Sequence, residues 1–125
     1  MTLKILKNEF TVCKPSDLTK IRFDDRFCFI GKTADELSLV CYTSSVPDNV
    51  KEHEDGWRGF YIEGIIDFAL TGVLSGILTP LAKAGIGVFA VSTFNTDYIF
   101  VKEKVFETAL GLLQDRGYKL DRSAV

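Results

Sequence analysis

The chain is poor in the residues that carry most protein chemistry. Among its 125 residues are one histidine and one tryptophan, and its three cysteines include no Cys-x-x-Cys pair. The histidine, His53, lies in the charged run Lys51–Gly56, which we interpret as a solvated loop. The sequence therefore contains too few suitably spaced histidine and cysteine side chains to form a metal centre or a cysteine–histidine nucleophile. With no phosphate loop and no base–nucleophile pair in the sequence, we predict no catalytic residue, no metal, no cofactor and no enzymatic activity.

The cysteines are few, odd in number and widely spaced, at Cys13, Cys28 and Cys41. Each lies in a strand-like run, where a free thiol behaves as a small hydrophobic side chain. An odd count without a recognisable signal peptide fits reduced thiols. We therefore expect a cytoplasmic protein whose cysteines pack rather than react.

An excess of charge of one sign is also missing. Lysine and arginine total 15 against 17 aspartate and glutamate residues, for a net charge of −2, and the basic residues form no patch. This argues against a nucleic-acid partner. The one long uncharged run, Phe68–Ala82, contains Pro80 and is shorter than the roughly twenty residues that span a bilayer. We interpret it as a buried helix and predict no membrane association.

Apolar residues, in contrast, are plentiful enough for a core, at 46% hydrophobic and 12% aromatic. In the first half we predict three strands, at Thr2–Val12, Phe27–Ile30 and Leu37–Tyr42. We also predict one weak, polar helix at Asp48–Glu54. In the second half we predict strand, helix, strand, strand, helix and strand, at Trp57–Ile66, Thr71–Ala84, Gly87–Thr93, Asp97–Val101, Glu103–Asp115 and Tyr118–Leu120.

The order of elements in the second half is typical of an α+β fold. The order βαββαβ predicts the ferredoxin-like sandwich, in which an antiparallel four-stranded sheet carries helices on one face. The first half looks like a reduced version of the same unit with poor helices. We therefore predict two fused subdomains, at residues 1–56 and 57–125.

A polar cluster, Ser92–Asp97, separates the two strands of the second half and follows a glycine-bearing helix. The start of a helix offers unpaired N–H groups to a carboxylate, and Asp97 offers a negative charge to an ammonium group. Together they outline a binding site for a zwitterion. In the alternative interpretation Asp97, Ser92 and Thr93 bond only to neighbouring groups, and Gly72 serves only packing.

Three segments together resemble the ACT domain, a small regulatory module that binds amino acids. They are the hairpin Phe29–Val40, the helix and turn residues Gly72–Leu74, Pro80–Ala82 and Gly85–Ile86, and the strand motif Ser92–Val101. The similarity is greatest to the small tandem-ACT proteins of bacteria and to the cytosolic arginine sensors of animals. The resemblance implies a reduced ACT-like N-terminal half fused to a full C-terminal ACT unit.

The resemblance, with the polar pattern, also implies a ligand-binding set: Thr71, Gly72, Val73, Leu74, Ser92, Thr93, Phe94 and Asp97. It implies an amino-acid-binding regulatory or sensory protein that binds a free amino acid, forms a homodimer and acts on a regulated protein partner. The arginine sensors have an acidic residue where this chain has Leu70, so a smaller or less basic amino acid is expected. The alternative is a ligand-free module for protein–protein interaction or dimerisation.

Overall fold

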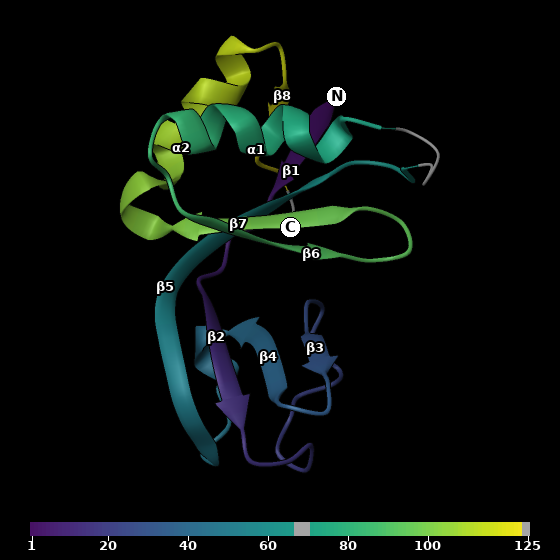
Figure 1. The fold of residues 1–125 in the computed structure, drawn as a ribbon, viewed down its shortest axis with the longest axis vertical. Helices are drawn as coiled ribbons and strands as arrows, with labels where there is room; N and C mark the ends of the chain where they lie inside the picture. The colour runs from purple at the N-terminus through teal and green to yellow at the C-terminus, as the bar shows by residue number, and fades with distance from the viewer. Residues whose placement is uncertain (67–70, 124–125) are drawn as a thin grey trace. The chain divides into compact units, whose positions relative to one another are not determined.

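The computed structural model describes residues 1–66 and 71–123, shown in Figure 1. Two α-helices occur in this part of the chain, α1 (Val73–Lys83) and α2 (Glu103–Asp115). The strands are β1 (Thr2–Ile5), β2 (Phe10–Pro15), β3 (Phe29–Lys32), β4 (Leu37–Tyr42), β5 (Val50–Ile62), β6 (Val88–Ser92), β7 (Asp97–Lys102) and β8 (Lys119–Asp121). The chain divides into unit 1, Met1–Lys7 with Arg58–Val125, and unit 2, Asn8–Trp57. Strand β5 contributes residues to both units.

Unit 1 confirms the predicted ferredoxin-like α+β fold. From the second half of β5 the elements follow as α1, β6, β7, α2 and β8, which is the βαββαβ order. The strands lie in the order β6-β7-β5-β1-β8, and both helices cover the same face of this sheet (Figure 1). The helices present apolar faces to the sheet because their buried residues recur at helical spacing, as Ile77 and Leu81 do in α1 and Phe106, Leu110 and Leu113 in α2.

Strand β1 lies inside the unit 1 sheet, between β5 and β8. It runs antiparallel to β5 and parallel to β8, so Leu3 pairs with both Ile62 and Leu120. The prediction of four antiparallel strands is therefore incomplete, because the sheet holds a fifth strand with one parallel pairing. The Lys4 ammonium stabilises the pairing of β1 with β8 by donating a hydrogen bond to the carboxylate of Asp121 at 2.8 Å.

The prediction of one continuous strand over Thr2–Val12 is wrong. The structure has two strands, β1 and β2, which lie in different units: both pair with β5, along different parts of it, but the second neighbour is β8 for β1 and β4 for β2. The break falls where the chain becomes polar and exposed, at residues 7–9. A strand needs partners along its whole length, and no single pair of neighbours serves both segments.

Helix α1 closely approaches Tyr118, the residue that precedes β8. A Cβ at Gly76 would stand 3.1 Å from the hydroxyl of Tyr118, a tighter contact than most Cβ atoms make, so a larger residue there would require the tyrosine hydroxyl to shift. No helix within residues 1–66 and 71–123 combines the length and the apolar character that crossing a bilayer requires.

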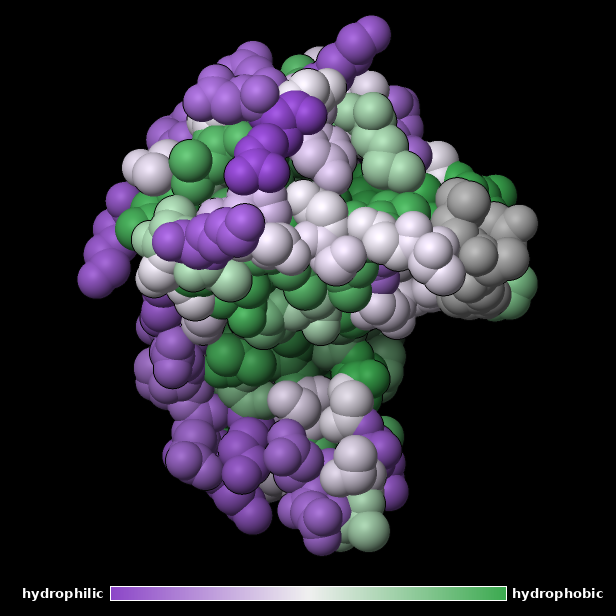
Figure 2. Space-filling model, turned by 45° about the horizontal axis from the view of Figure 1, so that its top comes forward, coloured by the Kyte–Doolittle hydropathy of each residue, from purple (hydrophilic) through white to green (hydrophobic). Residues whose placement is uncertain are grey.

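Unit 2 contains β2, β3, β4 and the first half of β5, in the order β3-β4-β2-β5 with antiparallel neighbours throughout. The predicted weak helix over Asp48–Glu54 is wrong, because β5 begins at Val50 and pairs with β2. His53 is accordingly exposed on a strand rather than in a loop, and its Nδ1 lies 3.1 Å from Asp55 Oδ1. The lower left of Figure 2, where this part of β5 runs, is hydrophilic.

The three cysteines share one small core in unit 2. Cys13 and Cys41 are buried with Leu39 and Ile21, and Cys28 packs against them. Burial raises the pKa of all three thiols, that of Cys41 to about 12. These side chains therefore stay protonated and pack as hydrophobic residues.

Candidate functional site

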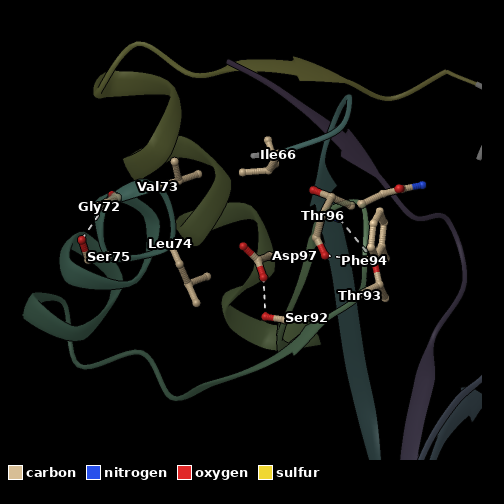
Figure 3. Close-up of a pocket in the computed structure, with 11 residues that line it drawn as sticks. Ile66, Gly72, Val73, Leu74, Ser75, Ser92, Thr93, Phe94, Thr96 and Asp97 are labelled. Atoms are coloured by element: carbon tan, nitrogen blue, oxygen red, sulfur yellow. Dashed lines mark hydrogen bonds between the residues drawn. The ribbon is translucent and has the colours of Figure 1, made fainter. Parts of the chain in front are cut away.

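A cavity of about 310 Å³ lies in unit 1 between the start of α1 and the β6–β7 hairpin (Figure 3). Its lining comes from three segments: the stretch after β5, the first turn of α1 and the hairpin loop. The lining residues are Ile66, Gly72, Val73, Leu74, Ser75, Ser92, Thr93, Phe94, Asn95, Thr96 and Asp97.

The first turn of α1 forms one wall. The first helical bond runs from the N–H of Gly76 to the carbonyl of Gly72, at 2.9 Å, so the N–H groups of Val73, Leu74 and Ser75 have no partner within the helix. Gly72 precedes the helix with a left-handed φ of 80° and supplies no side-chain cap. This end of the helix therefore offers hydrogen-bond donors and the positive end of the helix dipole.

The β6–β7 hairpin forms the opposite wall. Ser92 and Asp97 pair across its end, and the Ser92 hydroxyl donates to the Asp97 carboxylate. Figure 3 shows Asp97 on the side of the hairpin that faces Leu74 of α1. Between them the loop closes on itself, because Thr93 N–H donates to the Thr96 carbonyl at 2.9 Å and Thr93 Oγ1 donates to the same carbonyl at 3.0 Å.

Two hydrogen bonds hold this hairpin loop against the end of β5. The hydroxyl of Thr96, which is only 6% exposed, donates to the carbonyl of Ile62 at 2.7 Å. The N–H of Ile66 donates to the carbonyl of Asn95, also at 2.7 Å. The loop is thereby fixed to the end of β5 and to the segment that follows it.

The structure brings together seven of the eight residues predicted to bind ligand. Thr71, the eighth, is exposed and does not line the cavity. Leu70, on which the expectation of a less basic ligand depends, lies outside the described residues. Phe94 lies at the rim with 79% of its surface exposed.

Four lining residues were not in the predicted set: Ile66, Ser75, Asn95 and Thr96. Ser75 follows directly on the predicted helix start, and Asn95 and Thr96 fall inside the predicted polar cluster, so extending both segments would have found them. The sequence contains no comparable signal for Ile66, because its place depends on the contact between the loop and the end of β5.

The two walls are complementary to a zwitterion. The helix end favours a carboxylate, whereas the Asp97 carboxylate favours a cation, and the two face each other across one cavity. Within the described residues, no group of three or more histidine, cysteine, aspartate or glutamate side chains could hold a metal ion.

The sequence profile of one protein family, the ACT domain, matches residues 52–115. The chain belongs to the ACT domain family. The match covers all but the first two residues of β5 and continues through α2, so it includes every described residue that lines the cavity. ACT domains are regulatory modules that typically bind small ligands.

Solved structures share this ACT fold. A crystal structure of protein Atu0741 from Agobacterium tumefaciens is 31% identical, covers 99% of this chain and 94% of its own, and superposes with a TM-score of 0.85. A crystal structure of VC0802 from Vibrio cholerae, described as a protein of unknown function and a possible transport protein, is 15% identical. The match covers 90% of this chain and 86% of the VC0802 chain, with a TM-score of 0.69. No curated protein matches the chain in sequence.

An ACT-like region also occurs within a larger enzyme. The aspartate kinase of Clostridium acetobutylicum, described as an allosteric enzyme, is 15% identical with a TM-score of 0.62. The likeness covers 87% of this chain but only 33% of the kinase chain. At this identity the likeness concerns the fold alone.

Proposed function

We propose that the protein is an amino-acid-binding regulatory or sensory ACT protein without catalytic activity of its own. One observation supports this most directly: the free N–H groups at the start of α1 face the Asp97 carboxylate across a single cavity. In the proposed complex the helix end binds the ligand's α-carboxylate, and Asp97 binds its α-ammonium. Binding would then act on a partner protein, and we expect this to happen in the cytoplasm.

We further propose a tandem ACT arrangement, related to the small bacterial branch and to the arginine sensors. Without β1, unit 1 has the strand order β6-β7-β5-β8, and unit 2 has the matching order β3-β4-β2-β5. Thr33 and Thr93 hold equivalent places in the two hairpins, where each donates its N–H to a carbonyl three residues later at 2.9 Å. In unit 2 the connection from β2 to β3 holds no helix, and that from β4 to β5 holds only the short 3-10 turn Thr43–Ser45.

The amino-acid site can be tested directly by calorimetry after a thermal-shift screen of the free amino acids. At least one should raise the unfolding temperature, because a ligand that binds only the folded state stabilises it. Its N-acetyl derivative, which lacks the ammonium, and its amide, which lacks the carboxylate, should both bind more weakly than the amino acid itself. The proposal fails if no amino acid binds, and a ligand-free interaction or dimerisation module would then be preferred.

A further inference from the structure

The cavity has one ionisable side chain among the described residues that line it. Asp97 carries a negative charge, and no lysine, arginine or histidine lines the cavity beside it. The α-ammonium of an amino acid already uses this carboxylate, and the α-carboxylate already uses the helix end. A third charge, on the ligand's own side chain, would have no opposite charge in the described lining. Enclosing such an unpaired charge is strongly unfavourable.

The hydroxyl groups of the lining are already engaged within the protein. Ser75 donates to the carbonyl of Gly72 at 3.2 Å, and Ser92 donates to Asp97. Thr93 and Thr96 donate to main-chain carbonyls, at 3.0 and 2.7 Å respectively. Each hydroxyl has one proton to give, so these four offer a ligand only acceptor lone pairs. An amide or carboxylate oxygen on the ligand's side chain would find no hydroxyl donor among them.

The rest of the described lining consists of Gly72, Phe94 at the rim, Asn95 and three aliphatic side chains. Val73 and Leu74 come from α1 and Ile66 from the segment after β5, and all three pack against the unit 1 core. The cavity volume of about 310 Å³ lies at the small end of ligand pockets, which run from roughly 300 to 1,000 Å³. The small volume, the three aliphatic side chains and the engaged hydroxyls all favour a short hydrocarbon side chain.

We infer that the ligand is an amino acid with a small, uncharged, aliphatic side chain. This inference rests on the proposed amino-acid site and adds the chemical class of the ligand. Ile66, Val73 and Leu74 contact the ligand's side chain, while Asp97 and the helix end bind its charged groups. The described lining contains no second carboxylate for a guanidinium or side-chain ammonium and no cation for a side-chain carboxylate, so arginine, lysine, aspartate and glutamate should all bind more weakly than an aliphatic amino acid.

Calorimetry on the full chain tests this with alanine, valine, leucine, arginine, lysine, aspartate, glutamate and tryptophan as probes. The tightest ligand should be one of the three aliphatic amino acids, and each charged one should bind at least about tenfold more weakly. A charged amino acid or tryptophan as the tightest ligand would overturn the inference but leave the amino-acid site standing. Binding of none of the twenty amino acids would overturn the proposed function itself.

A variant pair at Ile66 tests the apolar contact separately. Ile66→Glu places a carboxylate in the aliphatic part of the lining, and Ile66→Gln has nearly the same shape without the charge. In folded Ile66→Glu protein the best aliphatic ligand should bind at least about tenfold more weakly, and lysine or arginine should bind better than to Ile66→Gln. Unchanged affinity for the aliphatic ligand in Ile66→Glu would overturn the assignment.

Discussion

The hydroxyl of Ser92 donates a hydrogen bond to the carboxylate of Asp97, the residue directly opposite it in the β6–β7 hairpin. The bond uses one acceptor lone pair of a carboxylate oxygen and orients the Asp97 carboxylate at the edge of the cavity. A carboxylate accepts about four hydrogen bonds, so this one contact leaves it able to bind an ammonium. The Ser92–Asp97 pair therefore positions the charge on which the proposed site depends.

Asp97→Asn should weaken amino-acid binding by well over tenfold with little effect on the fold. Removing one partner of a buried, hydrogen-bonded charge pair typically costs about 2–5 kcal/mol, much of it from leaving the other charge unpaired. Calorimetry with the amino acid that stabilises the wild type measures the change. Asp115→Asn, at an exposed position at the end of α2, removes the same charge away from the cavity and should leave affinity unchanged. Equal affinity in folded Asp97→Asn protein would refute the site.

The protein should form a homodimer at micromolar concentration, and we expect β6 to take part. Among the described strands β6 pairs only with β7, and its residues Val88–Ser92 carry no charge. Exposed apolar edges of this kind favour pairing with another strand, and lysine on an edge prevents it. Sedimentation velocity at tens of micromolar should show a dimer for the wild type and a larger monomer fraction for Ala90→Lys. A wild type that stays monomeric with and without amino acids contradicts the prediction.

Gly59→Ala should destabilise the protein by about 1–3 kcal/mol, the usual cost of overpacking. A Cβ at Gly59 would lie 2.7 Å from the ring of Phe100, which is fully buried and stacked on Phe89 at 4.8 Å. Gly111→Ala in α2 is the matched control, because its Cβ would meet no atom within 4 Å and alanine favours helix. Urea unfolding should show a loss for Gly59→Ala and no loss for Gly111→Ala. Similar midpoints for the two variants would argue against the predicted clash.

The thiols should react slowly in the folded protein. Burial raises the pKa of Cys13, Cys28 and Cys41, so the reactive thiolate is scarce at pH 8. Alkylation by iodoacetamide should be slower than in urea for all three thiols, and at least about tenfold slower for Cys41, whose pKa rises to about 12, since each pKa unit changes the thiolate fraction tenfold. Cys28, the least buried of the three, should react first. Single alanine variants should lose stability and keep ligand affinity within a few-fold, whereas loss of binding in a folded variant would place that cysteine in the site.

Stability should fall in acid partly through Asp121. Its hydrogen bond from Lys4, with two further bonds from Ser123, holds the pKa of this carboxyl far below the ordinary value near 4. The folded state therefore binds fewer protons than the unfolded state, and this contribution is present above about pH 4 and is lost as pH falls below it. Urea unfolding between pH 7 and pH 2.5 should show a smaller acid loss for Asp121→Asn than for the wild type. Parallel curves would exclude this origin.

Sequence patterns predicted the second half of the chain well, because local rules govern it. The helix predicted at Thr71–Ala84 is observed at Val73–Lys83, since its apolar residues recur at one spacing and face one core. The hairpin around Ser92–Asp97 has strand-forming residues on both sides of a short polar loop, which also specifies where the cavity wall lies.

The first half could not be predicted as well, because its structure depends on distant partners. The polar run at the start of β5 has no intrinsic strand pattern and becomes a strand by pairing with β2, as Lys14 with Glu52 illustrates. Strand β1 is only four residues long, and its neighbour β8 lies near the other end of the described chain. Likewise, Ile66 enters the cavity lining through one long-range contact with Asn95, which local patterns do not encode.

The position of β1 between β5 and β8 imposes an order of assembly during synthesis. Unit 2, Asn8–Trp57, is one continuous stretch and has its strands complete before α1 has been made. Strand β1 must wait for β8, since Lys4 and Asp121 are separated by 117 positions, and closing so long a loop carries an entropic cost and slows folding. At about 5–20 residues per second, this leaves β1 without its second neighbour for many seconds. Among the described strands, the one synthesised first is thus completed last, and the sheet beneath the cavity forms fully only when the ribosome has passed β8.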